Sequence, residues 1–264
     1  MRKIWLAVTL GVVAALAVAG IASAVNTYVI DVGKTSPDKP GSTSKPLPVK
    51  VDFGYEVGDT ENLRPSVINQ YYIAEEGIKY YAKARPTCTF AQADESPRYD
   101  NKCKKAVVGS GSIANAFGPA SDRTAKAGCD VKLTLLNISN GPGVTRKRGG
   151  MAIRIDTDPP ACPLSIHGAL PAPIYDVKID GVPSSEYRFR VPDNLTHPAP
   201  GVDNSVIDVI THIPKKTGKV KIKGKQRTVG FASSVGRKGA KRTLRVTFVS
   251  EDGNRETATQ QFPN

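Results

Sequence analysis

The 264-residue sequence is poor in the side chains that metal binding and nucleophilic chemistry need. It has four Cys, three His, two Met and one Trp. The histidines, His167, His197 and His212, lack the H-x-x-x-H or H-x-H spacing that would bring two imidazoles to one metal ion. No G-x-S-x-G pattern supplies the exposed serine of an α/β-hydrolase. The motifs therefore identify no catalytic residue, and we expect neither a metal nor another cofactor.

Long apolar runs are also scarce, and the one that is present lies at the N-terminus. Residues 1–3 (MRK) are basic, residues 4–20 are apolar, and residues 22–24 (ASA) form a small-x-small cleavage site. This pattern predicts a signal peptide over residues 1–24, cleaved near Ala24, and a secreted or cell-envelope protein. A retained membrane anchor is the alternative. No Cys near the cleavage site could carry a lipid.

The composition favours a folded, loop-rich β protein. With 39% hydrophobic and 23% charged residues, 24 Gly and 20 Pro, it excludes collagen, coiled coil and wholesale disorder. Thirteen short runs with period-two alternation, separated by Gly, Pro, Asn and Asp, predict strands between residues 27 and 250. We expect an all-β, antiparallel, sandwich-like domain over residues 47–264. A short first strand and a Pro/Ser/Lys-rich connector precede it in residues 25–46, and one helical turn is possible near residues 87–93.

The four cysteines, Cys88, Cys103, Cys129 and Cys162, predict two disulfides, because their number is even and the chain is expected to be exported. No C-x-x-C spacing favours zinc. Sequential pairing, Cys88 with Cys103 and Cys129 with Cys162, closes the shortest loops and is preferred. The other two pairings remain open.

Several local patterns within residues 49–214 resemble a family. They are residues 86–89 (PTCT), 103–111 (CKKAVVGSG), 159–163 (PPACP), 191–198 (VPDNLTHP) and 201–204 (GVDN). In these patterns the chain resembles a group of secreted, functionally uncharacterised β-rich proteins of high-GC Gram-positive bacteria. The resemblance implies an exported β-rich fold with disulfides, and it implies no activity.

Two short motifs match those of known enzyme classes, but their positions in the chain do not indicate an enzyme. Residues 109–114 (GSGSIA) match the G-x-G-x-x-A dinucleotide fingerprint, but the following residues alternate like a strand, so no nucleotide cofactor is expected. Residues 216–218 (KTG) and 42–45 (STSK) match elements of penicillin-recognising serine enzymes. Ser42, however, lies in the Pro-rich connector rather than at the start of a buried helix.

Four of the nine tyrosines are clustered within residues 71–81. Adjacent residues of a strand point to opposite faces of a sheet. For two paired strands, we therefore expect Tyr72 and Tyr80 to face the core and Tyr71 and Tyr81 to lie at the surface. Cross-strand aromatic packing is the favoured role for the cluster, and contact with a sugar or a protein partner is the alternative.

The charge distribution is the strongest anomaly. Residues 215–245 contain twelve Lys and Arg and no Asp or Glu, so this segment holds all of the positive excess that remains after the leader. Within it the cations alternate at Lys219, Lys221, Lys223, Lys225 and Arg227. They form one positive row if a single strand continues through them, or a basic hairpin if Gly224 turns the chain.

These observations favour a non-enzymatic structural or binding protein of the cell envelope or the extracellular space. The five alternating cations are the candidate polyanion-binding residues, and an anionic cell-wall polymer or an anionic lipid surface is the candidate partner. The competing explanation is that the lysines lie on an exposed edge strand and prevent it from pairing with the sheet of another molecule. Only Phe231 interleaves with the cations, so specific nucleic-acid binding is not expected.

Two other classes of function remain as alternatives. One is a secreted hydrolase acting on a polysaccharide or an ester, which needs a cleft with two carboxylates roughly 5 to 10 Å apart. The other is a protein-binding assembly module that works through edge strands or exposed tyrosines. The sequence does not determine the oligomeric state.

Overall fold

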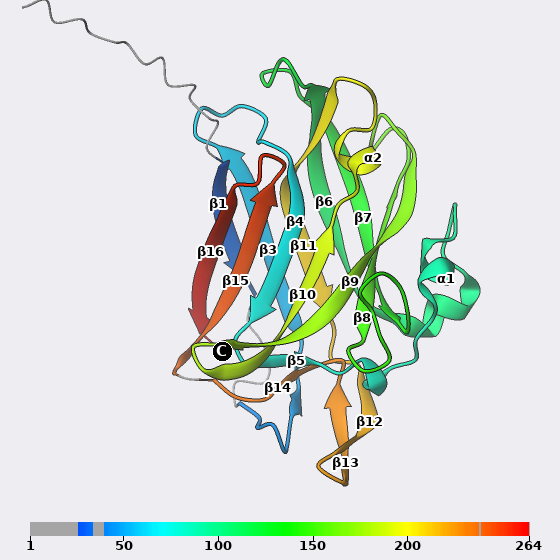
Figure 1. Cartoon of the computed structure of the whole chain (residues 1–264), viewed down its shortest axis with the longest axis vertical. Coiled ribbons are helices and arrows are strands. Elements are labelled where there is room, and N and C mark those ends of the chain that lie inside the picture. The colour runs from blue at the N-terminus through cyan, green and yellow to red at the C-terminus, as the bar shows by residue number, and fades with distance from the viewer. Residues whose placement is uncertain (1–25, 34–39, 238, 264) are drawn as a thin grey trace, which may run out of the picture.

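The computed structural model describes residues 26–33, 40–237 and 239–263 (Figure 1). The expected signal peptide, residues 1–24, lies outside the described residues, and so does the part of the connector formed by residues 34–39. In the part of the chain that is described, no helix is both long enough and apolar enough to cross a membrane.

Strands make up most of the described chain. Their bounds are β1 (Asn26–Val32), β2 (Leu47–Pro48), β3 (Val51–Asp59), β4 (Ile68–Glu75), β5 (Ile78–Tyr80), β6 (Val107–Pro119), β7 (Ala127–Ile138), β8 (Gly150–Thr157), β9 (Ile166–Ile179), β10 (Val182–Arg190), β11 (Val202–Ile213), β12 (Thr217–Ile222), β13 (Lys225–Gly230), β14 (Ala232–Ser234), β15 (Lys241–Ser250) and β16 (Arg255–Pro263). The helical segments are short: η1 (Ala82–Ala84), α1 (Phe90–Asp94), η2 (Asn101–Ala106) and α2 (Asp193–Thr196).

Eleven of the strands form one antiparallel sheet in the order β1-β3-β11-β6-β7-β8-β9-β10-β4-β15-β16. The sheet curls so that its two halves face each other like the layers of a sandwich (Figure 1). Its first and last strands come together, and the ring of Tyr28 on β1 stacks at 4.2 Å on that of Phe248 on β15. The expected all-β, antiparallel, sandwich-like fold is confirmed.

Alternating side chains build the core between the two halves. In β3, Val51, Phe53, Tyr55 and Val57 are all buried, as the alternation in the sequence predicts. Phe248 is fully buried and also lies edge-on to the rings of Tyr55 and Tyr71, at 5.3 and 5.9 Å. Aromatic packing from β1, β3, β4 and β15 therefore holds the two ends of the sheet against each other.

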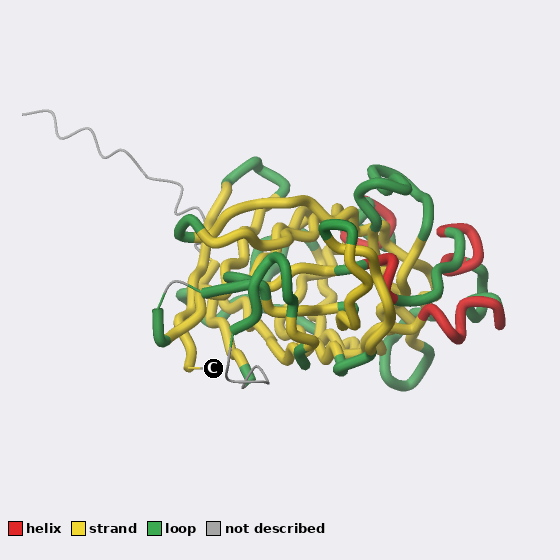
Figure 2. Tube along the Cα trace, turned by 90° about the horizontal axis from the view of Figure 1, so that it is seen from below, coloured by secondary structure: helices red, strands yellow, loops and turns green. Residues whose placement is uncertain are grey.

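Smaller elements cover the two ends of the curled sheet. The three-stranded sheet β2-β14-β5 lies at the lower end in Figure 1, where the buried ring of Phe231 packs 5.6 Å from Tyr80. The helix α2 lies near the upper end, and its Leu195 packs against the core. Figure 2, seen from below, shows that the helical segments gather at one end of the molecule.

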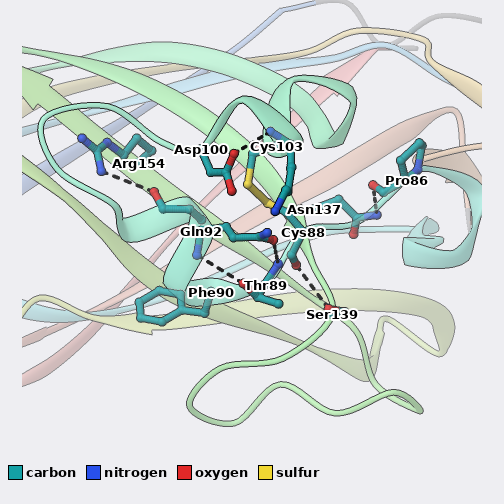
Figure 3. Close-up of a disulfide and its surroundings, with 12 residues drawn as sticks. Pro86, Cys88, Thr89, Phe90, Gln92, Asp100, Cys103, Asn137, Ser139 and Arg154 are labelled. Atoms are coloured by element: carbon teal, nitrogen blue, oxygen red, sulfur yellow. Dashed lines mark hydrogen bonds between the residues drawn. A yellow bond between two sulfur atoms is a disulfide. The ribbon is translucent and has the colours of Figure 1, made fainter.

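Both disulfides pair as the loop lengths favour, Cys88 with Cys103 and Cys129 with Cys162. The first closes a loop that contains α1, so the helical turn expected in this region is confirmed. The helix begins with a capping box, in which the Thr89 hydroxyl accepts from the Gln92 amide and the Gln92 side chain accepts from the Thr89 amide (Figure 3).

Two buried polar side chains tie this disulfide loop to the main sheet (Figure 3). The guanidinium of Arg154 on β8 is fully buried and donates to the carbonyls of Ala93 and Glu95. The amide nitrogen of Asn137 on β7 donates to the carbonyls of Ala82, Arg85 and Pro86. The segment from residue 82 to 97 is therefore held at a fixed position relative to β7 and β8.

Some expectations were wrong in detail. Tyr71, not Tyr72, points into the core: Tyr71 is 1% exposed, whereas Tyr72 is partly exposed. The reason is that β4 and β5 do not pair with each other, because β4 lies between β10 and β15 while β5 pairs with β14. The side of the sheet to which Tyr80 points therefore does not determine the side to which Tyr72 points.

Other strand boundaries also differ from the expected ones. The run expected at residues 78–83 ends as a strand at Tyr80 and continues as η1. The first half of β9, which carries Pro171 and Pro173, and the whole of β16 were not expected. In β16 most side chains are exposed and polar, so the strand lacks the apolar alternation that reveals the others.

We predict that both disulfides contribute to stability according to the loops they close. Replacing Cys129 and Cys162 with Ala should lower the free energy of unfolding by about 4 kcal/mol, and replacing Cys88 and Cys103 should lower it by about 3 kcal/mol. Urea denaturation monitored by circular dichroism measures both values. Loss of less than about 1 kcal/mol in either variant would show that the loop is already constrained in the unfolded chain.

An ion-pair cluster ties α2 to its neighbours. His197, the residue after α2, has its Nδ1 3.1 Å from Asp203 Oδ1 and its Nε2 2.6 Å from Glu251 Oε1. Burial opposes protonation of the ring, but the hydrogen bonds and negative charges of Glu251 and Asp203 outweigh burial and raise the pKa of His197 above 6.5. Protonated His197 therefore connects α2 with β11 and with the turn after β15.

We predict a pH-dependent contribution of His197 to stability. Since its pKa is raised in the folded state, the contribution is fully present below about pH 6.5 and is lost as the pH rises through the folded-state pKa. The melting temperature of the wild type should exceed that of His197→Gln at pH 6, and the difference should shrink by pH 9. A difference that stays constant over this range would contradict the assignment.

Candidate anion-binding cleft

The alternating cations lie on a projecting hairpin rather than in one row. β12 and β13 pair only with each other and project from the lower end of the molecule (Figure 1). Lys223 and Gly224 both have positive φ, 46° and 79°, and form the two-residue turn that such hairpins favour. Of the two readings of this segment, the hairpin is confirmed and the single row is wrong.

The hairpin register divides the cations between its two faces. Lys219 and Lys221 lie opposite Thr228 and Gln226 on one face. Lys225 and Arg227 lie opposite Ile222 and Val220 on the other face, and Lys223 occupies the turn. The five predicted residues are thus close in space, but no flat ligand could contact all of them from one side.

The base of the hairpin packs tightly on η1. A Cβ atom on Gly218 would lie 1.8 Å from the carbonyl oxygen of Ala84, so only glycine fits at this point of β12. The Arg85 guanidinium donates to the Thr217 carbonyl at 3.3 Å, and Lys216 Nζ donates to the Val107 carbonyl at 2.8 Å. These contacts fix the hairpin relative to η1 and to the main sheet.

A cleft opens between the hairpin, η1 and the segment of residues 145–149. One hollow of about 240 Å³ is lined by Tyr81 and by five cations, and an adjoining hollow of about 420 Å³ adds Arg85. The two hollows share Lys83 and Arg146, so they adjoin each other and are treated together as one depression. We call this depression the basic cleft, and its cations are Lys83, Arg85, Arg146, Lys147, Arg148 and Lys221.

The cations of the basic cleft and the hairpin have no carboxylate partners within the part of the chain that the structure describes. Among the described residues, no Asp or Glu lies within 4.0 Å of the charged group of any of them. By contrast, the buried cations Arg64 and Arg154 and the partly buried Lys79 are all paired. No carboxylate contributes to the lining of the cleft either. The cleft is therefore a region of uncompensated positive charge.

Two further observations describe the electrostatics of the cleft. The pKa of Lys216, at the base of the hairpin, is lowered by burial and by the positive charge of Arg85. The guanidinium of Arg148 lies 4.2 Å over the ring of Tyr175 and donates to the carbonyl of Gly143. The aromatic face orients Arg148 without neutralising its charge, so the guanidinium remains available to an anion.

The sequence predicts one of the six cations of the cleft and does not predict the other five. Of the five predicted cations, Lys221 lines the cleft, and the other four lie on the same hairpin. Lys83, Arg85 and residues 146–148 were missed. The three consecutive cations of residues 146–148 (RKR) were a usable signal, but nothing in the sequence indicates that they lie beside the hairpin.

A second groove, of opposite charge, lies on the outer face of β1, β3 and β11. It has a volume of about 360 Å³, and its lining includes the acids Asp31, Asp52, Glu56 and Asp208. Glu56 lies directly opposite Asp208 in the sheet register. Burial and the neighbouring charge of Glu56 raise the pKa of Asp208. His212 Nδ1 lies 3.0 Å from Asp52 Oδ1 in the same groove.

Within the described residues, no group of three or more His, Cys, Asp or Glu could hold a metal ion. The remaining histidine, His167, lies 3.1 Å from both Asp156 and Asp158.

No protein-family model, curated protein or solved structure matches the chain.

Proposed function

We propose that the protein is an exported, non-enzymatic binding protein of the cell envelope or the extracellular space, and that it holds an anionic surface polymer in the basic cleft. The observation that carries this proposal is the set of six cations around one depression with no carboxylate partner among the described residues. Edge protection does not account for this arrangement, because four of these six cations lie in loops and only Lys221 lies in a strand.

The chemistry of the cleft fits a chain of phosphates or carboxylates. Arginine presents a planar fork that binds such groups through two parallel hydrogen bonds, and lysine adds a mobile point charge. Arg146 and Lys147 on one wall and Lys221 on the opposite wall allow a linear polymer to be contacted from both sides. Binding releases counterions from the polymer, so the affinity should depend steeply on salt.

Two features of the chain support an extracytoplasmic location. All four cysteines are paired in disulfides, which persist in oxidising compartments. The sequence begins with a pattern typical of a signal peptide, and its local motifs resemble those of secreted proteins. An anionic cell-wall polymer, or an anionic lipid surface, is then the partner that such a protein meets first.

We predict that neutralising the cleft abolishes salt-sensitive binding. A variant in which Lys83, Arg146, Lys147, Arg148 and Lys221 are replaced by Gln should lose retention on purified cell walls and on a phosphodiester polymer at 50 mM salt. The wild type should show a slope of log affinity against log salt of about −4 for five contacts, and the slope of the variant should be close to zero.

The matched control removes the same amount of charge elsewhere. Replacing five exposed lysines outside the cleft with Gln leaves the net charge equal to that of the cleft variant; they are Lys102, Lys104, Lys105, Lys126 and Lys132. This control should retain at least half of the wild-type affinity. Equal loss in the two variants would mean that net charge alone drives retention, and the proposed site would be wrong.

A hydrolase is the second candidate, and the outer acidic groove favours it. Residues directly opposite each other in an antiparallel pair have Cβ atoms about 5 Å apart, so the side chains of Glu56 and Asp208 are near enough for their carboxylates to reach the separation that glycoside hydrolysis uses. The raised pKa of Asp208 suits a general acid. A groove that contains two neighbouring carboxylates is the feature that an enzyme acting on a polysaccharide needs.

Release of reducing ends from cell-wall polysaccharide by the mature chain tests this second candidate. Activity that falls at least 100-fold in Glu56→Gln and in Asp208→Asn would support it. The exposed Glu95→Gln is the control and should change nothing. If the wild type releases no reducing ends, or if both variants stay active, the acidic groove is not a catalytic site.

A further inference from the structure

The interior of the curled sheet contains an apolar cavity. Its volume is about 80 Å³, and its lining comes from β3, β4, β6 to β11 and α2. Aliphatic side chains such as Leu133, Ile153 and Leu170 supply most of the wall. No Asp, Glu, Lys, Arg or His contributes to it. The cavity is separate from the basic cleft, with which it shares no lining residue.

Three polar atoms among the lining residues are buried and have no hydrogen-bond partner among the residues that the structure describes. They are Tyr71 Oη, Asn115 Oδ1 and Asn204 Oδ1. Tyr71 is 1% exposed and Asn115 is 6% exposed. A buried polar group without a partner costs about 1 to 3 kcal/mol, so a water molecule or a ligand that supplies a hydrogen bond to these atoms is stabilised in the cavity.

The two asparagines lie on adjacent strands at the same end of the cavity. On the adjacent strands β6 and β11, Asn115 pairs with Val206 while Asn204 pairs with Phe117, so the two asparagines are diagonal neighbours. Diagonal neighbours lie roughly 7 to 8 Å apart. The amide nitrogen of Asn204 donates to the carbonyl of Leu195 in α2, which places this end of the cavity beside α2. The cavity thus has acceptors near α2 and an apolar body beyond them.

We propose that this cavity binds a neutral amphiphile, an aliphatic chain that carries one hydroxyl group. The hydroxyl donates its hydrogen to Asn115 Oδ1, and the chain lies among the aliphatic side chains of β7, β8 and β9. This binding does not depend on the basic cleft and adds a second ligand to the protein.

The lining selects the charge and the size of the ligand. An ionised carboxylate would be buried without a cation, which is far more costly than burying a hydroxyl that has a partner. A volume of about 80 Å³ has room for roughly three groups of the size of a water molecule. A hydroxyl group with about two carbon atoms therefore fills the cavity, and a longer chain such as that of 1-butanol must displace side chains of the lining at the end away from α2.

The test is a titration of the mature chain with 1-butanol, butyrate and butane-saturated buffer, monitored by methyl NMR resonances of the cavity leucines and isoleucines. We expect saturable shifts with 1-butanol and at least tenfold weaker binding of butyrate at pH 8. Asn115→Leu should weaken 1-butanol binding about fivefold, because one hydrogen bond is lost, and should leave butane binding unchanged or tighter.

A second variant keeps the proposal testable if Asn115→Leu does not fold. Leu133→Phe fills the cavity and should abolish the 1-butanol shifts, whereas Val29→Leu, on the exposed outer face, should not change them. The proposal is overturned if 1-butanol causes no saturable shift, if butyrate binds equally well, or if the cavity holds ordered water that 1-butanol does not displace.

Discussion

The packing of Phe248 against three other rings is the interaction on which the architecture depends. Tyr28, Tyr55 and Tyr71 come from β1, β3 and β4, so these contacts join strands from opposite ends of an eleven-stranded sheet. Without them the sheet would be an open, twisted surface with no enclosed interior. With the sheet closed, the apolar cavity lies inside it, and the outer face and the two ends carry the charged groups.

The basic cleft brings cations from three segments of the chain together at one end of the fold. Several cations elsewhere in the fold stabilise its structure: Arg154 anchors the disulfide loop, and Arg64 and Arg123 tie turns together through carbonyls and acids. At the lower end, the hairpin, η1 and residues 145–149 come together, and among the described residues their cations contact backbone carbonyls but no carboxylate. Repulsion among them is tolerated because η1 is fixed by Asn137 and by the disulfide loop. A structure that keeps unpaired cations in a fixed cleft is suited to an anionic ligand.

The sequence predicts those features that depend on neighbours along the chain. Alternation reveals strands such as β3 and β15, loop length selects the correct disulfide pairing, and Gly224 marks the turn of the basic hairpin. Features that depend on contacts between distant segments are not predictable in this way. The face on which Tyr72 lies follows from pairing with β10 and β15, and the approach of residues 146–148 to Lys221 follows from the docking of Gly218 on η1.

The most direct measurement is an NMR titration of the isotope-labelled mature protein with a short phosphodiester oligomer at low salt. Binding in the basic cleft predicts that the side-chain resonances of Lys83, Arg146, Arg148 and Lys221 shift together with one saturation curve, and that 0.5 M salt reverses the shifts. Shifts spread evenly over lysines of the whole surface, Lys102 and Lys132 included, would contradict the account, because they would show that the protein has positive charge but no site.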